Sequence, residues 1–212
     1  MCIRDRFNRS DLLSEAHGMG AQIAYFAEHW PQRKGVTTYF VTGDDHEGWY
    51  AQRENVEIGQ LLEDEARRNG RTDLVYCGHM EHDFLFKRKG GSATMRLVHA
   101  GGGSAYATSY TVQKLVESYQ GGEKPNILLV GHYHKADFSY PREVFTVQAG
   151  CTEDQSPFMR KKKIQAHVGG WTIEMIQSDD GLIHRFRPTW DPFYDLDFYK
   201  GKQWRYHWGK KR

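Results

Sequence analysis

The sequence has few cysteines, no long apolar run and no excess of charge of one sign. Its three cysteines among 212 residues are widely spaced and form no Cys-x-x-Cys, which excludes a disulfide framework and a thiolate zinc site. We therefore expect a reducing, cytoplasmic compartment. The longest aliphatic run, residues 127–130, is far below the ~20 residues that cross a bilayer, so we expect no membrane partner. The 29 Lys and Arg against 27 Asp and Glu leave a charge of +2, too small for a strong nucleic-acid or membrane field.

The composition is that of a folded protein, with 39% hydrophobic and 14% aromatic residues. Without repeats or a low-complexity linker, we expect a single domain over residues 7–199. Residues 1–6 look like a translated sequencing adapter and are expected to be a non-native leader. Residues 200–212 form a basic aromatic tail with six Lys and Arg. The tail leaves two readings open: a solvated end, which is the commoner case, or contact with nucleic acid or phosphate.

Hydrophobic periodicity and turn residues predict an alternation of helices and strands, followed by a mostly extended region. The predicted helices cover residues 10–30, 49–69 and 106–119. The predicted strands cover residues 36–41, 74–77, 84–86, 95–98, 127–130, 144–148, 167–176 and 182–187. This order predicts a layered α/β fold with mixed sheets.

Three of the buried strands run directly into polar turns that contain histidine. These turns are residues 43–47, 99–103 and 131–134. Because ligands bind outside the carboxyl ends of strands in open α/β sheets, we expect the turns to converge although they are far apart in sequence. Convergence would bring a carboxylate and several imidazoles together, a donor set that suits Mn, Fe, Zn or Ni better than Mg or Ca. The pattern therefore favours a catalytic metal site.

Each histidine-bearing turn also has an ordinary structural explanation. Asp44 and Asp45 are equally suited to form a turn and cap the helix that follows. His99 taken alone is more often a hydrogen-bonded buried histidine than a ligand. His132 and His134 lie two apart in what the pattern predicts to be extended chain, so they should point to the same side, yet such pairs also occur without a metal.

Three other segments are weaker candidates. Residues 78–83 contain two histidines and two acids, but their spacing fits no metal motif and a turn between strands is favoured. Residues 101–104 precede a predicted helix, where their backbone N–H groups would suit a phosphate, and flexible clearance explains the glycines equally well. Cys151 has no activating base nearby in the sequence, so we interpret it as structural.

The three turns together resemble the calcineurin-like metallophosphoesterases. That family's signature has five parts: Asp-x-His, Gly-Asp, Gly-Asn-His-Asp/Glu, a lone His after a strand, and Gly-His-x-His. The last three have counterparts here in Asp44-Asp45-His46-Glu47, His99 and Gly131-His132-Tyr133-His134. The resemblance spans roughly residues 10–150, and Gly-His-x-His after a buried strand is its most specific part.

The resemblance implies a four-layer α/β/β/α sandwich of two mixed sheets that holds two divalent transition metal ions, with Mn favoured and Fe, Zn or Ni as alternatives. Asp45, His99 and His132 would bind one ion and His134 the other, while His46 would protonate the leaving group. Two such ions bind phosphate oxygens, activate water and stabilise in-line displacement. A histidine proton donor then neutralises the departing alkoxide.

The sequence also departs from the family pattern. It has no Asp-x-His, its only Gly-Asp is Gly43-Asp44, and Asp45 replaces the usual asparagine and adds a negative charge. We therefore expect that the chain lacks the family's first strands, with the donors they carry, and that this fragment turns over weakly or not at all.

The first hypothesis for function is metal-dependent hydrolysis of phosphoesters, with phosphodiesters favoured over phosphomonoesters and with nucleotides or nucleic acids as candidate substrates. The alternative is a non-catalytic nucleic-acid-binding module on the same fold. A third hypothesis is a structural metal site in a non-enzyme, which would unfold when the metal is chelated. The sequence indicates no particular oligomeric state.

Overall fold

The computed structural model describes residues 18–196 except 45, 46, 104, 156 and 162. In this part, the chain forms two compact units, residues 18–82 and residues 83–196. None of the helices among these residues is long and apolar enough to cross a membrane. The leader and the basic tail that the sequence predicts lie outside the described residues.

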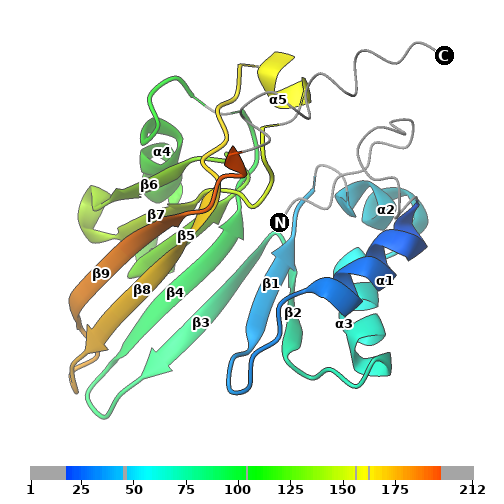
Figure 1. Cartoon of the computed structure of the whole chain (residues 1–212). Helices are drawn as coiled ribbons and strands as arrows, with labels where there is room; N and C mark the ends of the chain where they lie inside the picture. The colour runs from blue at the N-terminus through cyan, green and yellow to red at the C-terminus, as the bar shows by residue number, and fades with distance from the viewer. Residues whose placement is uncertain (1–17, 45–46, 104, 156, 162, 197–212) are drawn as a thin grey trace. The chain divides into compact units, whose positions relative to one another are not determined.

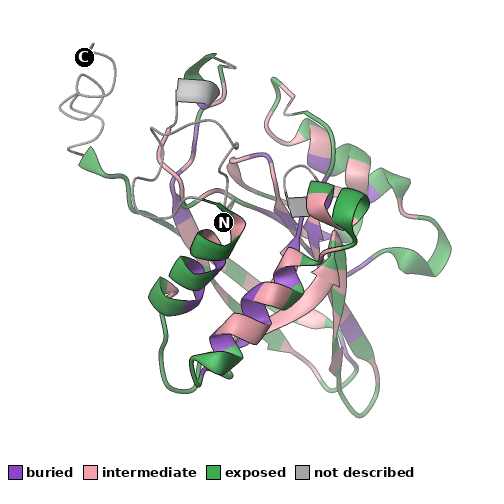
Figure 2. Cartoon of the chain, turned by 90° about the vertical axis from the view of Figure 1, so that its right-hand side faces the viewer, coloured by how far each residue is buried: buried purple, intermediate pink, exposed green. Residues whose placement is uncertain are grey.

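The N-terminal unit alternates helices with two parallel strands. Its elements are α1 (Met19–His29), β1 (Thr38–Thr42), α2 (Glu47–Glu54), α3 (Ile58–Arg68) and β2 (Leu74–His79). Strands β1 and β2 pair in parallel, as the chain crossing through α2 and α3 requires. Apolar residues of α1 and α3 bury one side of each helix against β2, and Figure 2 colours these stripes purple beside green exposed faces.

The helix predicted over residues 49–69 is wrong, because the structure has two helices there. Asn55 takes a left-handed conformation with φ 53°, and the Val56 N–H donates to the Tyr50 carbonyl at 3.3 Å. A residue in the left-handed conformation directly after the last helical residue is the way many helices end, and Asn is one of the residues that adopt it. Asn55 was therefore a stop signal inside a sequence that otherwise has good helix composition.

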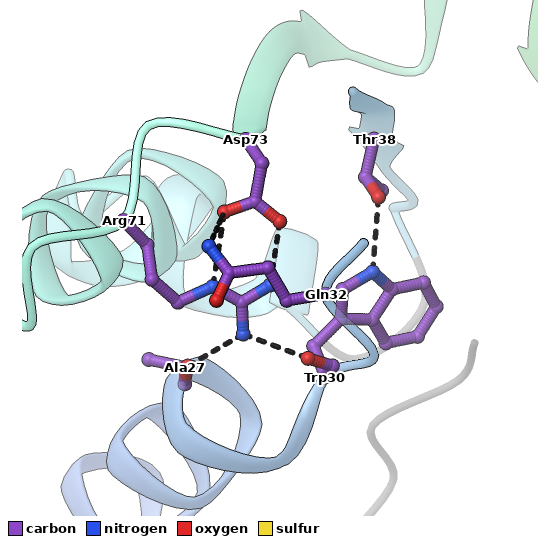
Figure 3. A network of polar contacts seen from close by, with 6 residues as sticks. All are labelled: Ala27, Trp30, Gln32, Thr38, Arg71 and Asp73. Carbon is purple, nitrogen blue, oxygen red and sulfur yellow. Dashed lines mark hydrogen bonds and ion pairs between the residues drawn. The ribbon is translucent and has the colours of Figure 1, made fainter. Parts of the chain in front are cut away.

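A buried arginine fastens the end of α1 to the chain before β2. Arg71 is 7% exposed, and its Nη1 donates to the carbonyls of Ala27 at 3.0 Å and Trp30 at 2.7 Å. Its Nε and Nη2 donate to the two oxygens of Asp73 at 3.1 and 2.7 Å, and Gln32 donates to the same carboxylate (Figure 3). The arginine thus satisfies helix-end carbonyls while the carboxylate balances its charge. These hydrogen bonds lower the pKa of Asp73.

The C-terminal unit is built on a mixed five-stranded sheet in the order β3-β4-β5-β7-β6. The strands are β3 (Glu81–Lys87), β4 (Ser92–His99), β5 (Ile127–Gly131), β6 (Ala136–Ser139) and β7 (Phe145–Ala149). Strands β4, β5 and β7 are parallel and β6 runs antiparallel to β7 (Figure 1). The carboxyl ends of β4 and β5 therefore meet at one edge of the sheet.

Different elements cover the two faces of this sheet. Helix α4 (Tyr110–Ser118) places Val112 and Val116 on the buried apolar residues of β4 and β5. The antiparallel pair β8 (Gly169–Gln177) and β9 (Ile183–Pro192) covers the other face, where Phe186 stacks on Phe138 and Phe145. The short helices are η1 (Gly121–Glu123), η2 (Pro141–Glu143) and α5 (Pro157–Lys161). The predicted α/β class is confirmed, whereas the four-layer arrangement stays a prediction.

One local prediction in this unit needs correction, and two short elements were missed. The helix predicted from residue 106 begins at Tyr110, because the Thr108 carbonyl accepts a hydrogen bond from the Gln148 side chain instead of a helical amide. Strand β6 was missed because its sequence, Ala-Asp-Phe-Ser, has little apolar character. Helix α5 is only five residues long, too short to produce a periodic pattern.

Gly169 provides a test of how closely β9 packs on the start of β8. A Cβ on Gly169 would lie 2.5 Å from Trp190 and 2.6 Å from the backbone oxygen of Asp191, whereas a Cβ on Gly170 would meet nothing closer than 3.8 Å. We expect Gly169→Ala to lower the free energy of unfolding by about 1–3 kcal/mol, since backbone cannot move aside as a flexible side chain can. Gly170→Ala is the matched control. Urea denaturation followed by tryptophan fluorescence measures both, and equal midpoints for the two variants would contradict this packing.

Candidate metal centre

His99 and His132 meet at the carboxyl ends of the neighbouring strands β4 and β5. The parallel register places His99 opposite Gly131, one residue before His132. The two imidazole ring centres lie 4.8 Å apart, with the planes inclined by 62°. The structure therefore brings together two of the turns that the sequence predicted to converge.

His132 is held by the glycine-rich turn that follows β4. Its Nε2 lies 2.7 Å from the carbonyl oxygen of Gly102, and because a carbonyl only accepts, Nε2 carries the proton and donates it. The other ring nitrogen, Nδ1, is then the one with ligand character. A backbone carbonyl that fixes the tautomer in this way is the usual support of a metal-binding histidine.

The backbone at His132 and His134 is not extended, contrary to the prediction. His132 has φ 89° and His134 has φ 55°, both in the left-handed region that residues other than glycine seldom occupy. Alternation along a strand therefore does not set the direction of the two rings. Such conformations cost about 1–3 kcal/mol each and persist where surrounding contacts fix them, often at functional sites.

Tyr133 lies between the two histidines and holds the same glycine turn. Its hydroxyl donates to the carbonyl of Gly101 at 3.0 Å, its ring lies 5.3 Å from that of His132, and burial raises its pKa. The carbonyls of Gly101 and Gly102 thus accept hydrogen bonds from the motif after β5. The suggested phosphate site at a helix start is wrong, because α4 begins only at Tyr110.

His134 is fixed through its backbone. Its carbonyl accepts from the N–H of His167 at 3.0 Å, and the next carbonyl, that of Lys135, accepts from the N–H of Gly150 at 2.9 Å. The ring atom Nδ1 of His134 is shielded from solvent. The residue is therefore anchored to segments that come much later in the chain.

Asp45 and His46 lie outside the described residues, so their assigned roles stay predictions. Among the residues that the structure describes, no group of three or more His, Cys, Asp or Glu is placed to hold a metal ion. The segment over residues 78–83 makes the expected turn: β2 ends at His79 and β3 begins at Glu81. Cys151 donates from Sγ to the Glu153 carbonyl at 3.3 Å, in keeping with a structural role.

Gln148 is a residue near this site that the sequence reasoning missed. It lies on β7 opposite Val130 and is 1% exposed. Its side-chain Nε2 donates to the Thr108 carbonyl at 2.9 Å, and its backbone carbonyl accepts from the indole N–H of Trp171 at 2.8 Å. The only hint in the sequence is a glutamine at the end of the β-branched and aromatic run 144–147. Gln148 connects the chain before α4 with β8 next to the turn that carries His132.

The spacing of His99 and His132 fits two ligands of one ion. Two imidazoles that bind an ion at ~2.0–2.1 Å, with ligand angles between tetrahedral and square, have ring centres roughly 4.5–5.2 Å apart. The observed 4.8 Å lies within that range. The distance is therefore compatible with two ligands of one ion, although the described residues form no group of three or more His, Cys, Asp or Glu that could hold one.

Comparisons with known proteins give only distant similarities. No protein-family model matches the chain, and no curated protein matches it. The chain is similar to a single-mutant Vps29 from Entamoeba histolytica at 12% identity and a TM-score of 0.37, covering 80% of this chain and 88% of that one. It is also similar to an archaeal phosphodiesterase at 10% identity and a TM-score of 0.36, covering 80% and 74%. A zinc-bound wild-type Vps29 from E. histolytica is similar at 13% identity and a TM-score of 0.33, and the match covers 72% of this chain and 98% of that one. TM-scores this low carry no weight for function.

Proposed function

We propose that this chain carries the metal centre of a phosphoester hydrolase, with phosphodiesters as the favoured substrates. The observation that carries the proposal is the pair His99 and His132, with ring centres 4.8 Å apart at the ends of parallel strands. The Gly-His-x-His motif at residues 131–134 adds the resemblance noted in the sequence. Nitrogen donors at a strand-end edge favour a catalytic transition metal over a structural thiolate site.

The proposed ligands divide between two ions. Asp45, His99 and His132 would hold one divalent transition ion, with Mn favoured, and His134 would contribute to the other. Bound ions of this kind supply charge stabilisation to the phosphoryl oxygens and lower the pKa of water.

The remaining groups position the ligands and handle protons. The Nε2–H of His132 donates to the Gly102 carbonyl, and this hydrogen bond sets the orientation of the ring before any ion binds. Tyr133 holds Gly101 in the same turn and so limits its movement. His46 would donate a proton to the leaving oxygen, since an imidazolium can do so near neutral pH.

Manganese titration by calorimetry tests the proposal on the chain itself. We expect one tight Mn(II) site in the wild type and loss of that site in His132→Ala. The matched control is His184→Ala, an exposed histidine on β9 in the same unit, which should bind as the wild type does. Hydrolysis of an activated phosphodiester, measured in parallel, is expected to be weak.

Binding that does not respond to His132→Ala, or no binding at all, would contradict the metal centre. That result would favour the alternative, a non-catalytic nucleic-acid-binding module. Salt-dependent binding of a DNA or RNA oligonucleotide that survives His132→Ala would then be the expected observation.

A further inference from the structure

Three segments of the C-terminal unit join in a ladder of hydrogen bonds next to His134. The His167 N–H donates to the His134 carbonyl, the Cys151 N–H donates to the His167 carbonyl, and the Gly169 N–H donates to the Cys151 carbonyl, each at 3.0 Å. Gly150 adds a bond to the carbonyl of Lys135 at 2.9 Å. The turn that carries His134 is therefore held by Gly150 and His167 and not only by its own strand.

The side chain of His167 adds a second contact to this turn. Its Nδ1 lies 2.9 Å from the Ala136 backbone nitrogen and 3.4 Å from the Ala136 carbonyl oxygen. These two contacts require opposite protonation of Nδ1. The amide proton is permanent and its contact is the shorter, so Nδ1 accepts from Ala136 and the ring proton resides on Nε2.

His167 consequently forms hydrogen bonds with the residues on both sides of Lys135. Its backbone N–H binds the carbonyl of His134, and its ring nitrogen binds the amide of Ala136 two residues later. The first of these contacts fixes the carbonyl of His134 itself, whose backbone is left-handed at φ 55°, and the second fixes the amide that follows Lys135. A conformation that costs about 1–3 kcal/mol needs contacts beside it to remain the populated one.

We propose that His167 is the positioning residue that keeps His134 in its left-handed conformation and so directs its ring. This inference deepens the proposed function, because His134 is the ligand assigned there to the second ion. His167 itself is no ligand through Nδ1, since that nitrogen is occupied by the Ala136 amide. No spacing rule in the sequence connects residues 134 and 167.

Amide exchange at Ala136 tests this role without any metal. In His167→Asn the side-chain oxygen can take the place of Nδ1, whereas in His167→Gln the oxygen reaches to where Nε2 lies. We expect Ala136 to exchange about tenfold faster in His167→Ala and His167→Gln than in the wild type, and the Asn variant to restore slow exchange. The backbone coupling constant of His134, which reports φ, should change in the same two variants.

A tautomer measurement on the wild type covers the case in which a variant fails to fold. Long-range nitrogen–proton NMR should find the ring proton of His167 on Nε2. A proton on Nδ1, equal exchange in all four proteins, or rescue by Gln as good as by Asn would each overturn the role. If the wild type binds no Mn(II), the proposed function fails, while these measurements still decide whether His167 positions His134.

Discussion

Replacing Asp73 by alanine is expected to lower the free energy of unfolding of the N-terminal unit by about 2–3 kcal/mol. The substitution would leave the guanidinium of Arg71, whose side chain is only 8% exposed, without the carboxylate that accepts two of its bonds. That guanidinium also holds the carbonyls of Ala27 and Trp30, so the end of α1 should loosen as well. The partial exposure of Asp73, at 13% of its side chain, keeps the effect below that of a fully buried pair.

Glu65→Ala is the matched control for this prediction. It removes the partner of Arg68 in an ion pair of the same unit, in which the arginine side chain is 69% exposed. Surface pairs contribute about 0–1 kcal/mol, so this variant should differ little from the wild type. Urea denaturation followed by circular dichroism measures both variants, and equal losses would show that burial of the Arg71 pair has no special role.

The stability that the Arg71–Asp73 pair contributes should depend on pH. The folded-state pKa of Asp73 is lowered from its ordinary value of 3.8, mainly by the bond from Arg71. The unfolded chain therefore binds the proton first as pH falls, and the stability from Asp73 is complete above about pH 4 and is lost as pH falls through the folded-state pKa. The difference between wild type and Asp73→Ala should accordingly shrink below pH 4 and stay constant from pH 5 to 8.

The sequence predicted the elements of the fold better than their ends. Apolar runs such as residues 127–130 identify buried strands because burial itself requires apolar side chains. Contacts with distant residues decide where α4 begins and why Arg71 is buried, and no local pattern records them. Asn55 is the exception, since Asn is one of the residues that end helices in a left-handed conformation, so the break between α2 and α3 has a signal in the sequence itself.

The candidate site was predictable to the same extent. A histidine directly after a buried strand could be placed at the carboxyl edge of a parallel sheet, and His99 and His132 do meet there. The left-handed turn, the support from Gly102 and the contacts of Gln148 and His167 depend on chain segments that are brought together only by folding. The place of these two histidines in the fold is thus more visible in the sequence than the orientation of their rings.

A double-mutant cycle on His99 and His132 should give the largest effect on metal binding. Because both rings would bind the same ion, we expect each single alanine variant to weaken Mn(II) binding by about 100-fold or more. The double variant should then lose little beyond the worse single variant, since the second ring no longer has a site to complete.

The comparison pair is His99→Ala combined with His184→Ala, whose effects should simply add because the exposed His184 on β9 is expected to make no contribution. Calorimetric titration of the four proteins in each cycle gives the coupling free energy directly. Independent, additive losses at His99 and His132 would mean that the two rings do not bind the same ion. In that case the 4.8 Å spacing would reflect ordinary packing of two strand-end histidines, the reading that each of them permits when taken alone.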